Sequence, residues 1–204
     1  MKKYLYLMRV HHYIKNILIF MPLIFSGNLT DRRKFTATLL GMIAFSLVTS
    51  AVYIINDIRD AEKDRMHPTK KNRPIASGAV TSFHAVVLMV FILIAAVVLL
   101  VVSDATAGSY ALVILYLFIN VAYSMGLKDV PLLDVTILAS GFLLRVLFGA
   151  VLTGTEVSEW LYLTVLSGAF YFSLGKRRNE LQKKKDGDTR KVLKYYTRDF
   201  QDKN

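Results

Sequence analysis

Four side chains with oxygen ligands follow a long apolar run at helical spacing. They are Asn56, Asp57, Asp60 and Asp64, and a helix that continues from the apolar run places them all on one face. Carboxylates this close repel one another unless a cation neutralises them, and hard oxygen ligands of this kind suit Mg²⁺. The spacing therefore predicts a magnesium site with these four residues as ligands. The alternative is a solvated helix end, in which neighbouring Arg and Lys side chains pair with the carboxylates.

A short basic loop follows this acidic face. Residues 67–78 read HPTKKNRPIASG and hold Lys70, Lys71 and Arg73 beside prolines and a glycine that fix the course of the chain. Adjacent carboxylates and cations are typical of a metal-bridged diphosphate, in which the carboxylates hold the ion and the cations bind phosphate oxygens. The alternative for these three cations is a loop that is basic only because it faces the cytoplasm.

The composition indicates that long apolar segments position these groups. Of the 204 residues, 54% are hydrophobic, and the mean hydropathy of +0.41 is unusual for a soluble domain. The net charge of +11 lies between the apolar runs, which favours anionic lipid or phosphorylated substrates over nucleic acid. The absence of cysteine excludes disulfides, thiolate metal sites and cysteine nucleophiles. The chain is therefore expected to be a polytopic membrane protein.

Six segments are expected to cross the ~30 Å hydrocarbon core as helices. The first begins near Tyr4, is interrupted by Pro22 and carries Arg9 and Lys15 by snorkelling. A cleaved signal peptide is the alternative there, but Phe25 stands where the cleavage site needs a small residue. The other five expected spans are residues 35–55, 82–102, 105–127, 135–153 and 160–175.

The distribution of Lys and Arg predicts the orientation of these spans. With the N-terminus in the cytoplasm, 22 of the 26 basic residues fall on the cytoplasmic side, together with the acidic face and its loop. Arg32, Arg33 and Lys34 fall on the opposite side, and Arg145 lies within a span. No repeat or linker divides the chain, so we expect one transmembrane bundle over residues 1–181 and a basic cytoplasmic segment over residues 182–204.

The acidic motif also resembles that of a known family. The pattern NDxxDxxxD over residues 56–64, followed by RPIxxG over residues 73–78, resembles the first aspartate-rich motif of the UbiA superfamily of membrane prenyltransferases. The resemblance implies an all-α transmembrane bundle with a cavity open to lipid and a Mg²⁺-diphosphate site at its cytoplasmic mouth, with Asp57, Asp60 and Asp64 as catalytic residues. It also implies a fold of roughly nine spans, of which this chain holds about six. We therefore expect that the sequence is truncated or that a second chain completes the bundle.

Further positions resemble one branch of this superfamily, the polyprenyl-phosphate phosphoribosyltransferases that act on decaprenyl phosphate. In ordinary prenyltransferases the end of the sixth span carries a second aspartate-rich motif, whereas here it is basic. A donor with a 5-phosphate as well as a diphosphate needs such extra cations. On this resemblance, the residues expected to bind substrate phosphates are Lys15, Asn16, Lys70, Arg73, Tyr123, Lys128, Asp134, Arg145, Lys176 and Arg177.

Asp134 and Arg145 are candidates without the resemblance too. They lie eleven residues apart, close to three helical turns, and share a helix face with Gly141. A charged residue within a span is a functional candidate by default, and the alternatives are an interhelical ion pair or a snorkelling side chain. A transporter fragment would use both as pathway residues, but it would leave the carboxylates at the mouth unexplained.

The resemblance implies transfer of a phosphoribosyl group from phosphoribosyl diphosphate to a polyprenyl phosphate, with release of pyrophosphate. Ordinary prenyl transfer to an aromatic or other small acceptor is the alternative. The expected cofactor is Mg²⁺, and the expected partners are the two substrates, the membrane and either a second copy or a completing chain, with no nucleic acid. The expected location is a bacterial or archaeal cytoplasmic membrane.

Overall fold

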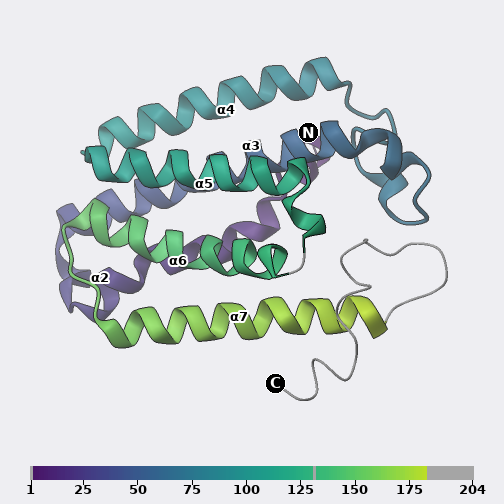
Figure 1. The fold of residues 1–204 in the computed structure, drawn as a ribbon. Helices are drawn as coiled ribbons and strands as arrows, with labels where there is room; N and C mark the ends of the chain where they lie inside the picture. Colours follow the sequence, from purple (N-terminus) through teal and green to yellow (C-terminus); the bar gives the residue numbers. More distant parts are fainter. Residues whose placement is uncertain (1, 131, 183–204) are drawn as a thin grey trace.

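The computed structural model describes residues 2–130 and 132–182, and all the regular secondary structure in this part of the chain is helical. Five long helices run lengthwise beside one another (Figure 1). They are α3 (Arg32–Arg65), α4 (Ser82–Val102), α5 (Ala107–Met125), α6 (Leu133–Thr153) and α7 (Glu159–Gln182). The expected all-α fold is therefore confirmed.

Four of the expected spans are helices long and apolar enough to cross a membrane. These are α3, α4, α5 and α6. Helix α3 continues past its apolar part through the acidic motif to Arg65, as the spacing predicts. Its N-terminus is capped by Asp31, whose carboxylate accepts hydrogen bonds from the backbone N–H groups of Arg33 and Lys34.

The first expected span is not one helix, and this corrects the sequence-based prediction. The N-terminal segment (residues 2–25) consists of α1 (Lys2–Met8), the 3₁₀ helix η1 (Val10–Phe20) and α2 (Met21–Phe25). Between α1 and η1, Arg9 adopts a left-handed conformation with φ 52° and ψ 47°. Pro22 lies in the first turn of α2, where a missing N–H costs no helical hydrogen bond. A short 3₁₀ turn, η2 (Asn28–Thr30), then leads into α3.

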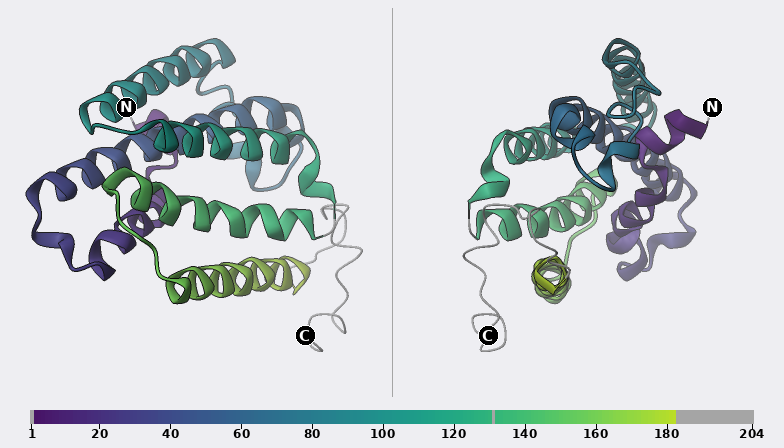
Figure 2. Two further views of the ribbon diagram at one scale, coloured as in Figure 1. Left: turned by 60° about the vertical axis from the view of Figure 1, so that its left-hand side comes forward. Right: turned by 90° about the vertical axis from the view of Figure 1, so that its right-hand side faces the viewer.

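The sixth expected span forms α7, but α7 is less apolar than the other long helices. Its apolar part ends where Lys176, Arg177 and Arg178 begin, and it is not among the helices that meet the length and hydropathy expected of a span. Its described contacts are mainly with α6, and Figure 2 shows it at the edge of the bundle. The expected basic segment lies outside the described residues, apart from Gln182.

Helix α3 is the centre of the packing. It contacts α4, α5, α6 and η1, and its Phe45 packs against Tyr116 of α5 and Phe148 of α6. The backbone of η1 lies directly against α6, because a Cβ at Gly149 would overlap the carbonyl oxygen of Ile19. Only glycine permits this approach, so α6 holds the N-terminal segment inside the bundle.

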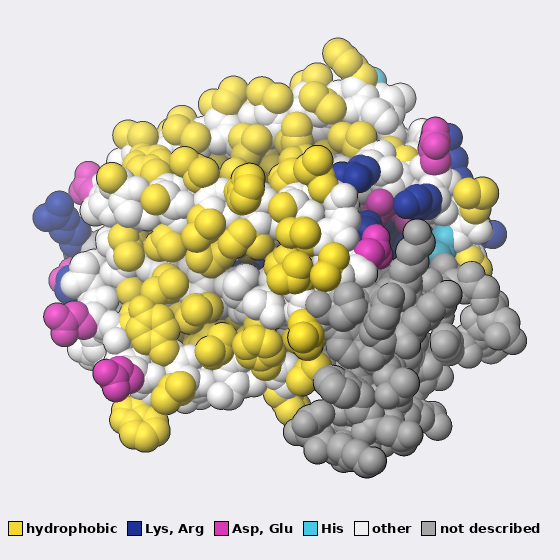
Figure 3. Space-filling model, in the orientation of Figure 1, with side chains coloured by type: hydrophobic (Ala, Val, Ile, Leu, Met, Phe, Trp, Pro, Cys, Tyr) yellow, Lys and Arg dark blue, Asp and Glu magenta, His cyan; other side chains and the backbone are white. Residues whose placement is uncertain are grey.

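One end of the bundle collects the segments expected to share a side of the membrane. The loop after α3, which contains η3 (Lys70–Asn72), lies at this polar end with η4 (Leu127–Asp129) and the end of α7 (Figure 1). Helix α1 reaches it too, since Lys3 Nζ donates a hydrogen bond to the Ala79 carbonyl at 2.9 Å. Figure 3 shows hydrophobic side chains covering the long face between two charged ends.

Candidate functional site

The acidic motif lies on the last turns of α3, at the polar end of the bundle. Asp57 and Asp64 are buried, with exposed fractions of 2% and 4%, while Asp60 and Asn56 are half-buried. The helical spacing places the aspartates on one face of α3, as predicted, and the structure shows that this face is turned inward. Burial of two carboxylates requires partners, because an unpaired buried charge is strongly destabilising.

The three carboxylates are paired with cations that come from three segments outside α3. Arg9 Nη2 lies 2.6 Å from Asp57 Oδ1, and Lys128 Nζ of η4 lies 3.3 Å from Asp60 Oδ2. A single nitrogen of Arg73, Nη1, bridges two carboxylates, at 3.3 Å from Asp57 and 2.6 Å from Asp64. We call these residues the acidic-face cluster, and they are Asp57, Asp60, Asp64, Arg9, Arg73 and Lys128.

The loop after α3 holds Arg73 in place through both of its halves. In its first half, Nδ1 of His67 accepts hydrogen bonds from the backbone N–H groups of Thr69 and Lys70, at 3.2 Å each. In its second half, Ile75 and Val80 are buried in the core beside α3 and α4. Arg73 lies between a hydrogen-bonded turn and an apolar anchor, so its guanidinium is directed back towards α3.

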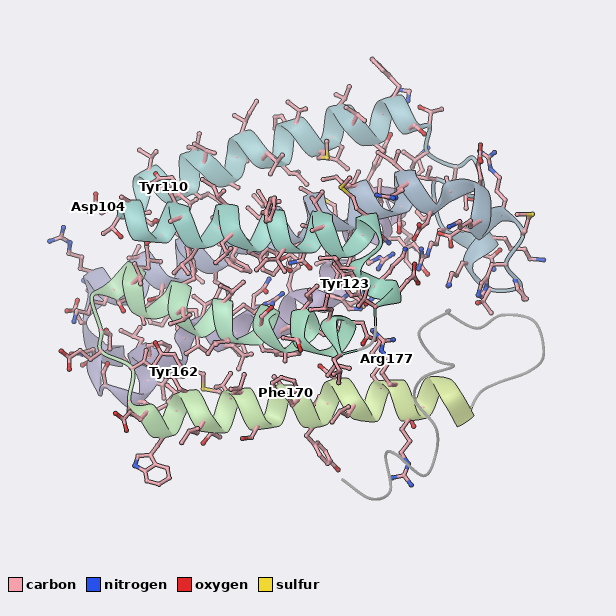
Figure 4. All side chains as sticks on the ribbon, viewed as in Figure 1. Asp104, Tyr110, Tyr123, Tyr162, Phe170 and Arg177 are labelled. Carbon is pink, nitrogen blue, oxygen red and sulfur yellow. The ribbon has the colours of Figure 1, made fainter. Side chains whose placement is uncertain are left out.

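A second set of predicted residues meets where α7 ends. Nε of Arg177 lies 2.5 Å from Oδ2 of Asp134 on α6, and both side chains are fully buried. Nη2 of Arg177 also donates a hydrogen bond to the hydroxyl of Tyr123 on α5, at 3.2 Å. Figure 4 shows Arg177 reaching from α7 towards Tyr123. We call Tyr123, Asp134 and Arg177 the α7 cluster.

Asn16 and Arg145 do not join either cluster. They lie inside the bundle, where Nε of Arg145 donates to the side-chain oxygen of Asn16 at 2.7 Å. Arg145 is about 16 Å along α6 from Asp134, at 1.5 Å of rise per residue. The sequence analysis predicted phosphate binding by this pair, whereas their burial and their mutual hydrogen bond are those of a structural tether; a variant of Asn16 distinguishes the two roles.

The remaining predicted phosphate ligands are at the surface. The side chains of Lys15, Lys70 and Lys176 are exposed. Lys70 lies in η3 beside Arg73, and Lys176 precedes the buried Arg177 on α7. The phosphate-binding role of these three lysines stays a prediction.

Arg9 is the site residue that the sequence analysis did not select. Its guanidinium pairs with Asp57 and lies over the ring of Tyr53, with 4.5 Å from Cζ to the ring centroid. Its left-handed backbone turns the side chain from the N-terminal segment towards α3. An arginine within a segment expected to span the membrane was the available signal, and the sequence analysis interpreted it as a snorkelling side chain.

The carboxylates of Asp57 and Asp64 fit a divalent ion because they converge on one cation. Within the described residues, no group of three or more His, Asp or Glu side chains is gathered as a ready-made metal site. Mg²⁺ commonly uses only one or two carboxylates, with phosphate and water completing its shell. Arg73 Nη1 already places positive charge between Asp57 and Asp64, so these two side chains converge on one cation. Their donor chemistry and convergence suit Mg²⁺.

The arrangement can therefore bind an anion through cations and a metal through carboxylates at the same place. Residues 17–192 match the UbiA prenyltransferase family. The chain belongs to this family. The resemblance predicted from the motif over residues 56–64 is confirmed, and with its four apolar spans the chain is an integral membrane protein.

Several relatives of the chain carry the same name. The decaprenyl-phosphate phosphoribosyltransferase of Mycolicibacterium smegmatis is 35% identical over 199 residues, which cover 94% of this chain and 62% of the relative. The enzymes of that name from Corynebacterium glutamicum and Mycobacterium tuberculosis are 30% and 38% identical and are covered over 58% and 52% of their lengths. The chain thus spans little more than half the length of these relatives.

Solved structures of the UbiA family share the fold. A UbiA homologue from Archaeoglobus fulgidus bound to DMAPP and Mg²⁺ superposes with a TM-score of 0.71 at 20% identity, covering 85% of this chain and 62% of that one. A digeranylgeranylglyceryl phosphate synthase gives the same TM-score and identity, with coverages of 97% and 70%. The helical arrangement is therefore that of the family.

Proposed function

We propose that this chain transfers a phosphoribosyl group from phosphoribosyl diphosphate to a polyprenyl phosphate and releases pyrophosphate. The observation that carries the proposal is the match of three decaprenyl-phosphate phosphoribosyltransferases over 78–94% of the chain at 30–38% identity. The basic end of α7 supports it, because a donor with an additional 5-phosphate needs cations there.

We assign Mg²⁺ binding to the carboxylates of α3. Support comes from the convergence of Asp57 and Asp64 and from the Mg²⁺ present in the Archaeoglobus relative. When bound, the ion would neutralise the diphosphate and so make it a better leaving group. Asp60 and Asn56, one on each side of Asp57 along α3, complete the proposed ligand set.

The cations of this chain then bind the phosphates of both substrates. Arg73, Lys70 and Lys128 would hold the donor diphosphate beside α3, while Lys176 and Arg177 would hold the other phosphate groups. An oxygen of the lipid phosphate forms a bond to the anomeric carbon of ribose, and the bond from that carbon to the diphosphate oxygen breaks. Pyrophosphate leaves with the electron pair. No general base is needed, because the attacking phosphate is already ionised.

We also propose the orientation predicted from the basic residues, with the N-terminus and the site in the cytoplasm of a bacterial or archaeal cell. The gathering of η3, η4 and the end of α7 at one end of the bundle supports it. The lipid-facing helices would deliver the polyprenyl chain from the bilayer, while the water-soluble donor enters from the cytoplasm. A second copy or a completing chain stays a prediction.

The experiment that tests the function compares two donors in membranes that contain the protein. Radiolabelled phosphoribosyl diphosphate with decaprenyl phosphate should give a labelled lipid, whereas a labelled prenyl diphosphate with an aromatic acceptor should give no product. The Asp60→Asn variant serves as the inactive control. Labelled product from the prenyl donor alone would overturn the proposal and establish prenyl transfer instead.

A further inference from the structure

The cations of the acidic-face cluster hold the places that a metal ion and a diphosphate would need. Nη1 of Arg73 is shared by Asp57 and Asp64, which is the position of a bridging cation. Arg9 binds the same oxygen of Asp57 that Arg73 contacts, at 2.6 Å. A divalent ion between these carboxylates must therefore displace at least one guanidinium.

Separation of a guanidinium from its carboxylate would be costly if only one of the two groups gained a new partner. Asp57 and Asp64 are buried, so a carboxylate that loses its guanidinium without gaining the metal is left as an uncompensated charge. A guanidinium that loses its carboxylate at the edge of the bundle equally needs an anion. The two costs cancel when the metal takes the carboxylates and an anion takes the cations in the same event.

The cations are placed so that they can make this exchange. The side chains of Arg9, Arg73 and Lys128 are 19%, 23% and 20% exposed, whereas the carboxylate of Asp57 is 2% exposed. In the pairs of Arg9 and Arg73 the positive groups thus lie on the outer side and the carboxylates of Asp57 and Asp64 on the inner side. Lys128 and Asp60 are about equally exposed, at 20% and 18%. The three cations also come from three separate segments, so each can shift without moving α3.

We propose that Arg73, Arg9 and Lys128 are exchangeable counter-ions of the α3 carboxylates. They neutralise the carboxylates before substrate arrives, and they transfer to diphosphate oxygens when Mg²⁺ takes their place. This inference deepens and rests on the proposed function, to which it adds a binding role for Arg9. It requires that metal and diphosphate bind with positive coupling, each raising the affinity for the other by the same factor.

The test measures metal binding directly, with Mn²⁺ in place of Mg²⁺ and inorganic pyrophosphate in place of the donor. Loss of the free Mn²⁺ resonance on titration of the purified chain in detergent gives the Kd. In the unaltered chain, pyrophosphate should lower the Kd of Mn²⁺ about tenfold or more. In Arg73→Gln, Mn²⁺ alone should bind about tenfold or more tightly than in the unaltered chain, and the effect of pyrophosphate should shrink.

A matched control separates exchange from a general loss of positive charge. Arg59 is also on α3 near the site, but its recorded contact is the carbonyl of Met125 rather than a carboxylate. Arg59→Gln should change the Kd of Mn²⁺ much less than Arg73→Gln does. Equal effects of the two variants, or no tightening in Arg73→Gln, would overturn the proposal.

A second variant covers the case in which Arg73→Gln does not fold. Lys128→Gln removes a cation from the half-buried Asp60 and leaves the two buried carboxylates paired. It should also lower the Kd of Mn²⁺ relative to Arg59→Gln, and failure to do so would count against the exchange.

The readout is independent of the transferred group, because both candidate donors carry a diphosphate. Phosphoribosyl transfer without coupled binding would therefore reject the exchange alone, and coupled binding with prenyl transfer would reject the proposed function alone.

Discussion

Nε of Arg145 on α6 donates a hydrogen bond to the side-chain oxygen of Asn16, 2.7 Å away on η1. The other groups that Arg145 binds are neutral as well, namely the Gly141 carbonyl and the Tyr116 hydroxyl. The guanidinium also lies over the rings of Phe45 and Tyr116. A charged side chain inside the bundle thus fastens the N-terminal segment to α6.

Asn16 is also the inner end of a polar ladder between η1 and α3. Going outward, four side chains of the N-terminal segment each form a hydrogen bond with a side chain of α3: Asn16 with Ser46, Tyr13 with Ser50, His12 with Tyr53 and Arg9 with Asp57. The four α3 residues lie on one side of the helix at three- and four-residue spacing. The ladder ends at the acidic-face cluster. It explains how a segment that lacks a continuous helix is held against α3 and how Arg9 reaches Asp57.

We expect Asn16→Ala to lower stability and leave substrate binding nearly unchanged. The substitution leaves the Nε–H donor of Arg145 and the hydroxyl oxygen of Ser46, which accepts from Asn16, without this partner, at a cost of about 1–3 kcal/mol. Thermal unfolding in detergent measures this loss, and KM for the polyprenyl phosphate should stay within about twofold, which is under 0.5 kcal/mol. A tenfold rise in that KM at unchanged stability would instead support phosphate binding by Asn16 and Arg145.

Gly149→Ala should destabilise the bundle, because the added methyl group meets the carbonyl oxygen of Ile19. Forcing η1 away from α6 should cost about 1–3 kcal/mol, seen as a lower unfolding temperature. Gly168→Ala is the matched control, since nothing lies within 4 Å of its added Cβ and alanine favours a helix. Similar unfolding temperatures for the two variants would contradict the close approach of η1.

The pair Asp134–Arg177 should behave as a coupled unit. Either Asp134→Asn or Arg177→Gln alone leaves a buried charge and should cost about 3–5 kcal/mol. The double variant removes both charges and should be more stable than either single variant. Unfolding measurements on all four proteins give the coupling energy, and additive losses would show that the two charges do not depend on one another.

Lys176 should contribute to the choice of donor without being needed for folding. Its exposed side chain lies beside Arg177, where a donor with an extra phosphate needs positive charge. Lys176→Gln should raise KM for phosphoribosyl diphosphate about tenfold, since a charge-assisted hydrogen bond contributes roughly 1.5–3 kcal/mol. KM for the lipid should change much less. An equal rise for both substrates would mean that Lys176 only anchors α7 at the membrane surface.

Asp60→Asn should abolish turnover while expression in membranes stays near normal. Asp60 is half-buried at the polar end, so the loss of its pair with Lys128 is a small cost to folding. Removal of divalent ions with a chelator should abolish turnover of the unaltered chain as well, and added Mg²⁺ should restore it. Full activity in the presence of the chelator would contradict a magnesium-dependent reaction.

The sequence by itself determined the elements that depend on local pattern. The apolar runs located α3 to α6, because a span must bury its own backbone hydrogen bonds and is therefore a continuous apolar helix. The spacing of Asp57, Asp60 and Asp64 placed them on one face of α3, because 3.6 residues per turn brings these positions together.

Only the tertiary structure decided which partners these side chains have. Arg9 and Asp57 are separated by 48 residues, and Asn16 and Arg145 by 129, so no local period relates them. The break at Arg9 was equally hidden, since hydrogen bonds of His12 and Tyr13 with distant residues of α3 hold the 3₁₀ helix in place. Buried polar groups must find partners, and packing of distant helices determines which ones they find.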